Sequence, residues 1–249
     1  MDMQMSVTAE QMDEIEHATL YQYGLQMIQL VENAGRGLAR VCRFVLGGRV
    51  LNKKIIVLAS GGKSSAGGLA AARNLHDWGA SLSVALVVPE DSLKRSALIQ
   101  FNIIRSMDIS IKGINSLNLA FLKKFDLIID ALFGHELKSA PAADFAHVIS
   151  LANKAKRPIV SLDMPSGINA TTGKIYNPCV KARSTVALAL PKTGLFKAEV
   201  AEYVGELWLA DIGVPPEVYA KIGLDGANPF IEDDLIRIRP KEEAVGIIA

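Results

Sequence analysis

The chain has 249 residues, of which 50% are hydrophobic and 21% are charged, and its formal net charge is +1. This is the composition of a globular protein with a sizeable core, and the small net charge gives no reason to expect a nucleic acid or an anionic membrane as a partner. Two cysteines and four scattered histidines exclude a disulfide framework and show none of the spacings that are typical of a metal site.

The amino-terminal residues carry no basic region followed by an apolar run, and no apolar stretch is long enough to span a bilayer, so we expect a cytoplasmic protein. Thr8 and Gln11 have the spacing of a capping box, which predicts a helix that continues to about Tyr23. A second helix is expected over residues 26–46, where apolar side chains recur along one face.

After residue 48, short apolar runs alternate with helical patterns. The runs cover residues 55–59, 82–88, 127–129, 159–162 and 185–190, and the helical patterns cover 68–78, 92–106, 116–124 and 144–155. Continuous apolar runs suit parallel strands that are buried on both faces. The alternation predicts a three-layer α/β/α, Rossmann-like domain with a mainly parallel sheet over residues 1–227, followed by a charged tail over residues 228–249.

Three of the predicted strand ends carry informative residues, and ligands of open parallel sheets bind beyond such ends. The first is the stretch SGGKSSAGG at 60–68, which precedes a helix and contains small residues that let backbone N–H groups approach a phosphate. It matches neither the Walker A motif nor GxGxxG. The stretch therefore indicates either a phosphate- or nucleotide-binding loop or simply a flexible turn.

The other two strand ends carry aspartates, Asp130 and Asp163. If these strands are parallel, both carboxylates lie at the same edge of the sheet as the glycine-rich stretch. Either aspartate alone could cap the next turn, but two of them beside one glycine-rich stretch favour a site. Lys192 follows another apolar run and either adds a cation to this site or is simply solvated.

Several segments resemble, in order, the NAD(P)H-hydrate epimerase family, whose domain is often called YjeF N-terminal. They are ENAG at 32–35, DALFG at 130–134, SLDMPSGIN at 161–169, PKTGL at 191–195, and GELW to DIGVP at 205–215. The resemblance runs from about residue 6 to 220. It implies an enzyme that interconverts the R and S forms of hydrated NADH and NADPH (NADHX and NADPHX) beside a dehydratase, binds a potassium ion and forms a homodimer.

The reaction and the resemblance together suggest roles for individual residues. A positioned carboxylate such as Asp163 could serve as the acid/base of an epimerase, with Lys192 as its helper. The potassium ligands implied by the resemblance are Ser64, Asp130 and Ser166. The residues implied to hold the substrate are Lys63, Ser64, Ser65, Ala66, Gly67, Gly134, His135, Glu136, Leu137, Lys138, Ser139, Ala140 and Asp163.

Two loops depart from the family pattern. The family's GNNGGDGL corresponds here to GKSSAGGL at 62–69, so that Ser64 replaces an asparagine and Gly67 an aspartate. The family's GTGL corresponds to GHEL, which places His135 and Glu136 where diphosphate or ribose would lie. The alternative to an epimerase is a weakened or inactive homologue that acts as a nucleotide-binding or dimerisation module. A P-loop kinase fits less well because its phosphate motif is incomplete.

Overall fold

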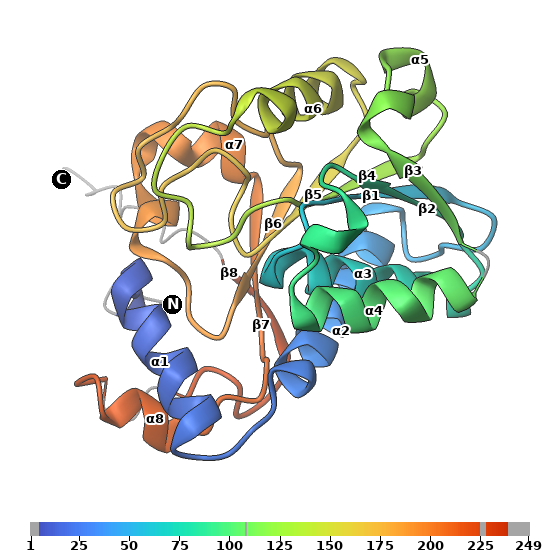
Figure 1. The fold of residues 1–249 in the computed structure, drawn as a ribbon. Helices are drawn as coiled ribbons and strands as arrows, with labels where there is room; N and C mark the ends of the chain where they lie inside the picture. Colours follow the sequence, from blue (N-terminus) through green and yellow to red (C-terminus); the bar gives the residue numbers. More distant parts are fainter. Residues whose placement is uncertain (1–4, 108, 225–227, 239–249) are drawn as a thin grey trace, which may run out of the picture.

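The computed structural model of the chain describes residues 5–107, 109–224 and 228–238. Its centre is a sheet of eight strands in the order β3-β2-β1-β4-β5-β6-β7-β8, in which every neighbouring pair is parallel except β7 and β8. The strands are β1 Lys54–Ala59, β2 Ser81–Leu86, β3 Ser110–Gly113, β4 Leu127–Ala131, β5 Ile159–Leu162, β6 Ser184–Leu188, β7 Glu206–Ala210 and β8 Leu235–Ile238. The predicted, mainly parallel sheet is confirmed, and Figure 1 shows its twist.

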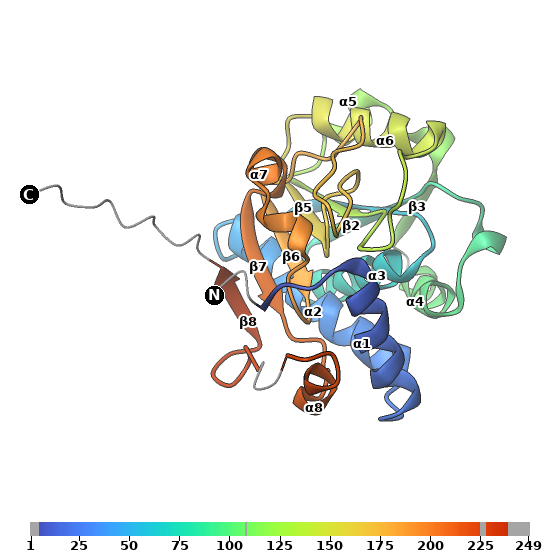
Figure 2. The same ribbon diagram turned by 90° about the vertical axis from the view of Figure 1, so that its left-hand side faces the viewer.

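Helices cover both faces of this sheet. They are α1 Ala9–Tyr21, α2 Met27–Val45, α3 Lys63–Asp77, α4 Arg95–Ser106, α5 Leu119–Leu122, α6 Ala143–Lys154, α7 Ala201–Val204 and α8 Pro216–Ala220. Helices α2, α3 and α4 pack on one face, and α5 and α6 pack on the other (Figures 1 and 2). Side chains of β1 alternate between the two layers, with Ile55 and Val57 on the α3 side and Ile56 and Leu58 on the α6 side. The three-layer architecture is therefore confirmed.

The first helix begins with the predicted capping box. The Thr8 Oγ1 atom accepts a hydrogen bond from the Gln11 N–H at 3.2 Å, and the Gln11 side chain accepts one from the Thr8 N–H at 2.9 Å. Just before this cap, Val7 forms a parallel bridge with Lys192, in the segment after β6. Helix α1 lies beside α8 (Figure 2). The bridge thus attaches the start of α1 to the chain that leaves the carboxyl end of the sheet.

The glycine-rich stretch at 60–68 is mostly helical, so the expectation that its helix begins only at residue 68 is wrong. Gly62 caps α3, which begins at Lys63. A Cβ atom added at Gly67 would lie 2.6 Å from the Leu162 side chain, and one added at Gly68 would lie 2.4 Å from that of Ala131. Close packing of α3 on the sheet, rather than loop flexibility, therefore requires these glycines.

Three strands were not expected from the sequence: β3, β7 and β8. Strand β8 lies within the stretch expected to be a tail and pairs in antiparallel fashion with β7, from Leu207 opposite Ile238 to Ala210 opposite Leu235. The sheet thus continues to Ile238, whereas residues 239–249 of the expected tail lie outside the described residues. No helix in the described ranges is long and apolar enough to cross a membrane.

Candidate active site

The ends of three adjacent strands form the candidate site. Strands β1, β4 and β5 are parallel neighbours, and in their register Leu58 pairs with Asp130 and Asp130 pairs with Ser161. Asp163 follows the last residue of β5 directly. The prediction that the glycine-rich stretch and the two aspartates share one edge of the sheet is therefore confirmed.

Asp163 is bonded to Lys192, the other residue expected to be catalytic. The Lys192 ammonium donates to Asp163 Oδ1 at 2.5 Å and to the Leu188 carbonyl at 2.9 Å. Neither side chain is accessible, with 0% of Lys192 and 3% of Asp163 exposed. The backbone of Asp163 has φ 67°, in the left-handed region that residues with a side chain rarely adopt. Strain of this kind clusters at functional sites, where surrounding contacts hold it in place.

His135 contacts the other oxygen of the same carboxylate. Its backbone N–H donates to Asp163 Oδ2 at 2.9 Å, and its ring Nδ1 lies 3.1 Å from that oxygen. The second ring nitrogen, Nε2, lies 3.1 Å from Oδ1 of Asp13 on α1. His135 was expected to bind substrate, whereas Asp13 was not singled out because the two residues lie 122 positions apart in the chain.

The charges of this cluster fix the protonation of Asp163. Burial alone would raise its pKa, but the Lys192 ammonium and the hydrogen bond and charge of His135 outweigh burial and hold the pKa well below its usual range. Burial also acts to lower the pKa of His135, and its hydrogen bond and charge interaction with Asp163 raise that pKa overall. Asp163 is therefore a carboxylate that can accept a proton or stabilise a cation, and a proton donor must be one of its neighbours.

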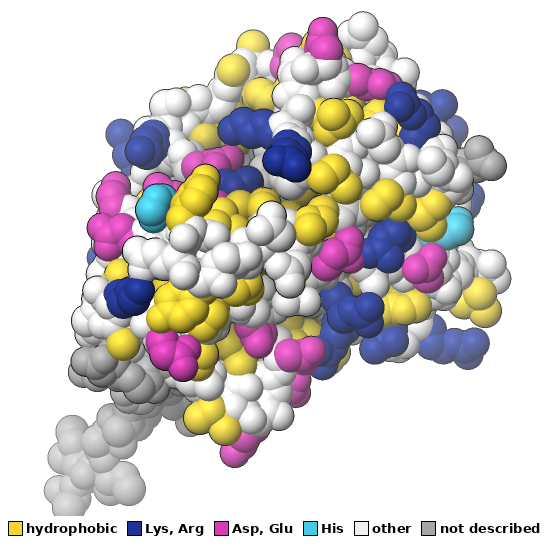
Figure 3. Space-filling model, turned by 60° about the horizontal axis from the view of Figure 1, so that its bottom comes forward, with side chains coloured by type: hydrophobic (Ala, Val, Ile, Leu, Met, Phe, Trp, Pro, Cys, Tyr) yellow, Lys and Arg dark blue, Asp and Glu magenta, His cyan; other side chains and the backbone are white. Residues whose placement is uncertain are grey.

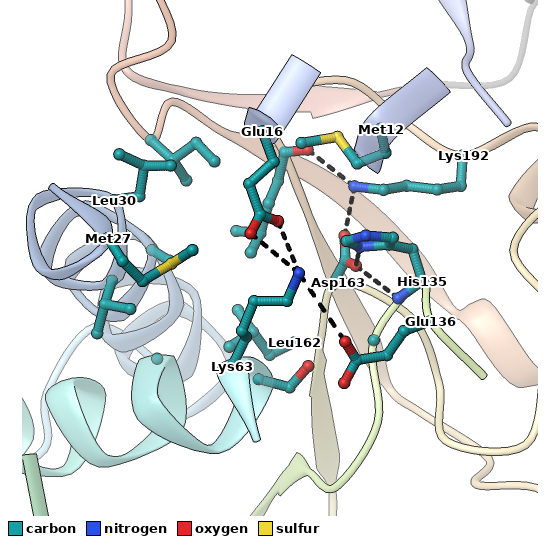
Figure 4. A pocket seen from close by; sticks show the side chains of 17 residues that line it. Met12, Glu16, Met27, Leu30, Lys63, His135, Glu136, Leu162, Asp163 and Lys192 are labelled. Atoms are coloured by element: carbon teal, nitrogen blue, oxygen red, sulfur yellow. Dashed lines mark hydrogen bonds and ion pairs between the residues drawn. The ribbon is translucent and has the colours of Figure 1, made fainter. Parts of the chain in front are cut away.

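A cavity opens beside this cluster, and both charged and apolar side chains line it (Figure 4). The apolar side chains include Met27 and Leu30 of α2, which face Asp163 and Lys192 across the space. The lining residues are Met12, Glu16, Met27, Leu30, Val31, Ala34, Lys63, Ser64, Gly67, Gly134, His135, Glu136, Leu162, Asp163, Leu188, Lys192 and Ile212. An apolar wall opposite a few convergent polar groups is the usual form of a small-molecule site.

Lys63 lines the cavity with a side chain that is 32% exposed, and carboxylates hold its ammonium group in place. Its ammonium donates to both oxygens of Glu16 on α1, at 2.8 and 3.0 Å, and lies 3.9 Å from Glu136. Burial acts to lower the pKa of Lys63, but the hydrogen bond and charge of Glu16 raise it overall. Glu16, like Asp13, was missed by the sequence analysis. Both partners come from α1, which therefore forms part of the wall of the site.

The other expected substrate residues divide into two groups. Ser64, Gly67 and Gly134 line the cavity, and a Cβ atom at Gly134 would lie 2.7 Å from Ser64 Oγ and 3.0 Å from Asp163 Oδ2. Ser65 instead fastens the turn before α3, since its hydroxyl donates to the Ala131 carbonyl and accepts from two backbone N–H groups. The remaining residues, which do not line this cavity, are Ala66, Leu137, Lys138, Ser139 and Ala140.

Asp130 is fully buried and bonded within the protein. Its two oxygens accept from the Ser166 hydroxyl at 2.6 Å, the Ser161 hydroxyl at 2.8 Å, the Ser166 N–H at 2.9 Å and the Leu132 N–H at 3.3 Å. In the described part of the chain no Lys, Arg or His forms an ion pair with it, and burial raises its pKa despite these hydrogen bonds. Two of the three expected potassium ligands, Asp130 and Ser166, are thus in direct contact.

One face of the molecule shows no single dominant charge. On the face in Figure 3, basic and acidic side chains are interspersed with apolar ones. This distribution agrees with the small net charge of the chain, and it distinguishes this face from the basic surfaces of nucleic-acid-binding proteins.

The fold and the site define a three-layer α/β protein with a buried, charged cluster at the carboxyl edge of its sheet. A family model described as "YjeF-related protein N-terminus" matches residues 27–194, more than half of the chain. The protein belongs to this family.

Similar proteins agree with this assignment. The chain is 33% identical over 240 residues to a protein named NAD(P)H-hydrate epimerase from Dehalogenimonas lykanthroporepellens, covering 95% of this chain and 94% of that one. It is 34% identical over 219 residues to the bifunctional NAD(P)H-hydrate repair enzyme Nnr of Moorella thermoacetica, covering 86% of this chain and 41% of that protein. The crystal structure of the yeast protein YNL200c shares the fold, with a TM-score of 0.81 at 24% identity over 94% of this chain and 99% of that one.

Proposed function

We propose that this protein is an NAD(P)H-hydrate epimerase that interconverts the R and S forms of NADHX and NADPHX. The observation that carries the proposal is the buried Asp163–Lys192 pair, which faces an apolar wall at the carboxyl edge of the sheet. The pair occurs in a chain whose relatives of similar length carry this enzyme name. The apolar wall suits the nicotinamide-derived ring of such a substrate, and the charged pair suits the carbon that carries the hydroxyl group.

The chemistry of epimerisation fits the charges of this pair. The hydroxyl-bearing carbon must lose and regain its configuration, which one route achieves by breaking and remaking its C–O bond. The hydroxyl takes a proton from the Lys192 ammonium and leaves as water with the bonding electrons, and the ring becomes a cation. The Asp163 carboxylate stabilises that cation. Water then adds from the opposite face and returns a proton to the site, so that substrate and product differ only in configuration.

We further propose that Asp130, Ser166 and Ser64 hold a monovalent cation, with potassium as the expected ion. A buried carboxylate without a basic partner is costly, and a bound cation offsets that cost. All three side chains offer oxygen ligands, which suit hard cations. When bound, the ion would supply positive charge near the substrate-binding loops.

The wider setting of the activity is also proposed from the family. We expect a cytoplasmic homodimer that works beside a dehydratase accepting one epimer of the hydrated cofactor. Lys63, Ser64 and Gly134 line the cavity and are the expected contacts of the substrate. The alternative function, a nucleotide-binding or dimerisation module without catalysis, is based on the altered loops, where Glu136 adds negative charge to the lining of the cavity.

An assay on separated epimers of NADPHX and NADHX tests the proposal directly. The wild-type chain should interconvert the epimers far faster than they interconvert in buffer. Asp163→Asn keeps the size of the side chain but removes its charge, and it should lower the rate by roughly 10²–10⁴-fold. An inactive wild-type chain that still binds the dinucleotide would favour the non-catalytic alternative.

A further inference from the structure

His135 connects two carboxylates that lie in different surroundings. Its Nδ1 atom is 3.1 Å from Asp163, whose side chain is 3% exposed, and its Nε2 atom is 3.1 Å from Asp13, whose side chain is 58% exposed. The histidine side chain itself is 10% exposed. These contacts form a continuous path from solvent through Asp13 and His135 to the Asp163–Lys192 pair (Figure 4 shows its inner part).

The two contacts couple the protonation of the ring to both carboxylates. An imidazolium has two N–H donors, and each can donate to an ionised carboxylate, whereas a neutral imidazole has one donor and one lone pair. When the ring is neutral, one carboxylate therefore faces a lone pair unless that carboxylate carries the proton itself. Loss of a proton at one nitrogen is thus linked to gain at the other, which is the behaviour of a proton relay.

The proposed reaction has a use for this path. The hydroxyl group departs as water with a proton from Lys192, and the water that returns releases a proton, so the site gives up one proton and regains one in each turnover. Lys192 is fully buried and Asp163 nearly so, so a connecting group is needed to carry protons between this pair and solvent. Among the described residues, His135 is the titratable group that is bonded to this pair and also reaches an exposed carboxylate.

We propose that His135 is a proton relay that connects solvent with the Asp163–Lys192 pair and uses Asp13 as its outer carrier. The proposal rests on the proposed epimerase activity. The inward step starts when Lys192 has given a proton to the substrate and is a neutral amine, and when Asp13 carries a proton. Nε2 takes that proton from Asp13 while the Nδ1 proton moves to Asp163 Oδ2. The carboxyl group so formed turns and gives the same proton to the Lys192 amine, which restores the Asp163 carboxylate. One N–H bond forms and one breaks at the ring, so that its charge is unchanged. The outward step is the reverse.

The charged groups around His135 come from four elements. Asp13 on α1 and Asp163 after β5 favour the imidazolium, whereas Lys63 on α3 and Lys192 after β6 disfavour it. Because the contacts with Asp163 outweigh burial, the pKa of His135 lies above its ordinary value. These contacts therefore stabilise the protonated ring, and they allow it to give a proton to either carboxylate neighbour.

Rates of epimer interconversion from pH 5 to pH 9 test this proposal in the full chain. His135→Asn keeps an amide near the position of Nδ1 but cannot titrate, and kcat should fall roughly 10²-fold with the pH profile flattened. Imidazole added to the buffer should restore part of the lost rate. Asp13→Asn should lower kcat less, because water can replace the outer carrier. Glu14→Gln removes an exposed carboxylate of the same helix and should leave the rate unchanged.

Two results would overturn the relay while the wild type stays active. One is a His135→Asn variant that keeps the wild-type rate, and the other is a loss of rate with an unchanged pH profile and no rescue by imidazole, which is the signature of a structural role. Melting temperatures show whether each variant is folded.

An NMR titration separates the relay from the proposed function. The His135 ring signal is assigned by its loss in His135→Asn, and its pKa should fall in both Asp13→Asn and Asp163→Asn. If the pKa of His135 is the same in Asp13→Asn as in the wild type, the relay is refuted, whether or not the protein is active. A wild type that fails to interconvert the epimers refutes the proposed function, and the catalytic use of the relay with it.

Discussion

Removing the buried ammonium of Lys192 should strongly lower the stability of the folded protein. Lys192→Met keeps the length and most of the volume of the side chain but removes its charge. Asp163 then remains ionised in a buried site with one oxygen unpaired, and the Leu188 carbonyl loses its donor. Removing one partner of a buried ion pair costs about 3–5 kcal/mol. For a chain of this size, that cost corresponds to a fall of roughly 6–20 °C in the melting temperature.

The matched control is an exposed lysine in an ion pair of normal geometry. Lys181 donates to Glu202 at 2.8 Å, but the two side chains are 54% and 62% exposed. Water replaces the lost partner at such a site, so Lys181→Met should hardly change the melting temperature. The difference between the two lysine variants measures the effect of burial rather than the effect of losing a positive charge.

A second variant at the same site tests the explanation. If the cost in Lys192→Met comes from the uncompensated Asp163 carboxylate, then Asp163→Asn in the same chain should recover more than half of the lost stability. Thermal unfolding followed by circular dichroism at pH 7 is a sufficient assay. A single variant that melts within 2 °C or so of the wild type, or a double variant no more stable than the single one, would refute this account of the pair.

Three other predictions concern pH, the cation and packing. The pKa of His135 is raised in the folded state. Its contribution to stability is therefore fully present below the pKa of the unfolded state and is lost as the pH rises through the pKa of the folded state. In a plot of melting temperature against pH, His135→Asn should lack this decrease. The pKa of Asp130 is raised by burial, so the ionised carboxylate destabilises the fold as pH rises, and potassium should stabilise the protein more at pH 8 than at pH 5. If the melting temperature in potassium equals that in a large organic cation at both pH 5 and pH 8, the protein has no cation site. Gly68→Ala places a Cβ atom 2.4 Å from that of Ala131 and should cost about 1–3 kcal/mol, whereas Gly113→Ala meets nothing within 4 Å and should cost much less in the same urea titration.

The sequence predicted the part of the site that depends on strand direction. Asp130 lies within β4 and Asp163 directly follows β5, and both strands were recognisable as continuous apolar runs. Once strand–helix alternation had indicated a parallel sheet, the common edge for the two aspartates followed from topology alone. Sequence patterns of this kind reveal which end of a strand a residue occupies but not its partner.

Contacts between residues that are far apart in the sequence could not be predicted from it. The partners of His135 and Lys63 on α1 lie 122 and 47 residues away, and no periodicity relates such positions. The strained backbone of Asp163, with φ 67°, was also missed, because aspartate is only enriched at positive φ and most aspartates have a negative one.

The start of α3 was misplaced because local propensity and tertiary packing conflict there. Glycine and serine are weak helix formers, so residues 63–67 were expected to precede the helix. In the structure, the absence of side chains at Gly67 and Gly68 lets α3 approach Leu162 and Ala131 closely. The gain from this packing outweighs the low helix propensity. Strand β3 was missed for a different reason, since its four residues are exposed or only half-buried and form no apolar run.

The contacts that the altered loops make with helix α1 help to decide whether this chain is an active enzyme or a non-catalytic module. Lys63 and His135 both depart from the family pattern, and both are charged or chargeable residues in a largely enclosed site. A loop that had only lost its function would have no reason to place such groups opposite complementary charges. Yet Lys63 is bonded to Glu16 and His135 to Asp13, and both carboxylates come from the same helix, α1. His135 is connected through Asp163 to Lys192, and Lys63 forms a second cluster with Glu16 and Glu136 in the lining of the same cavity. The changes in the loops are therefore better explained as a rebuilt site than as a decayed one.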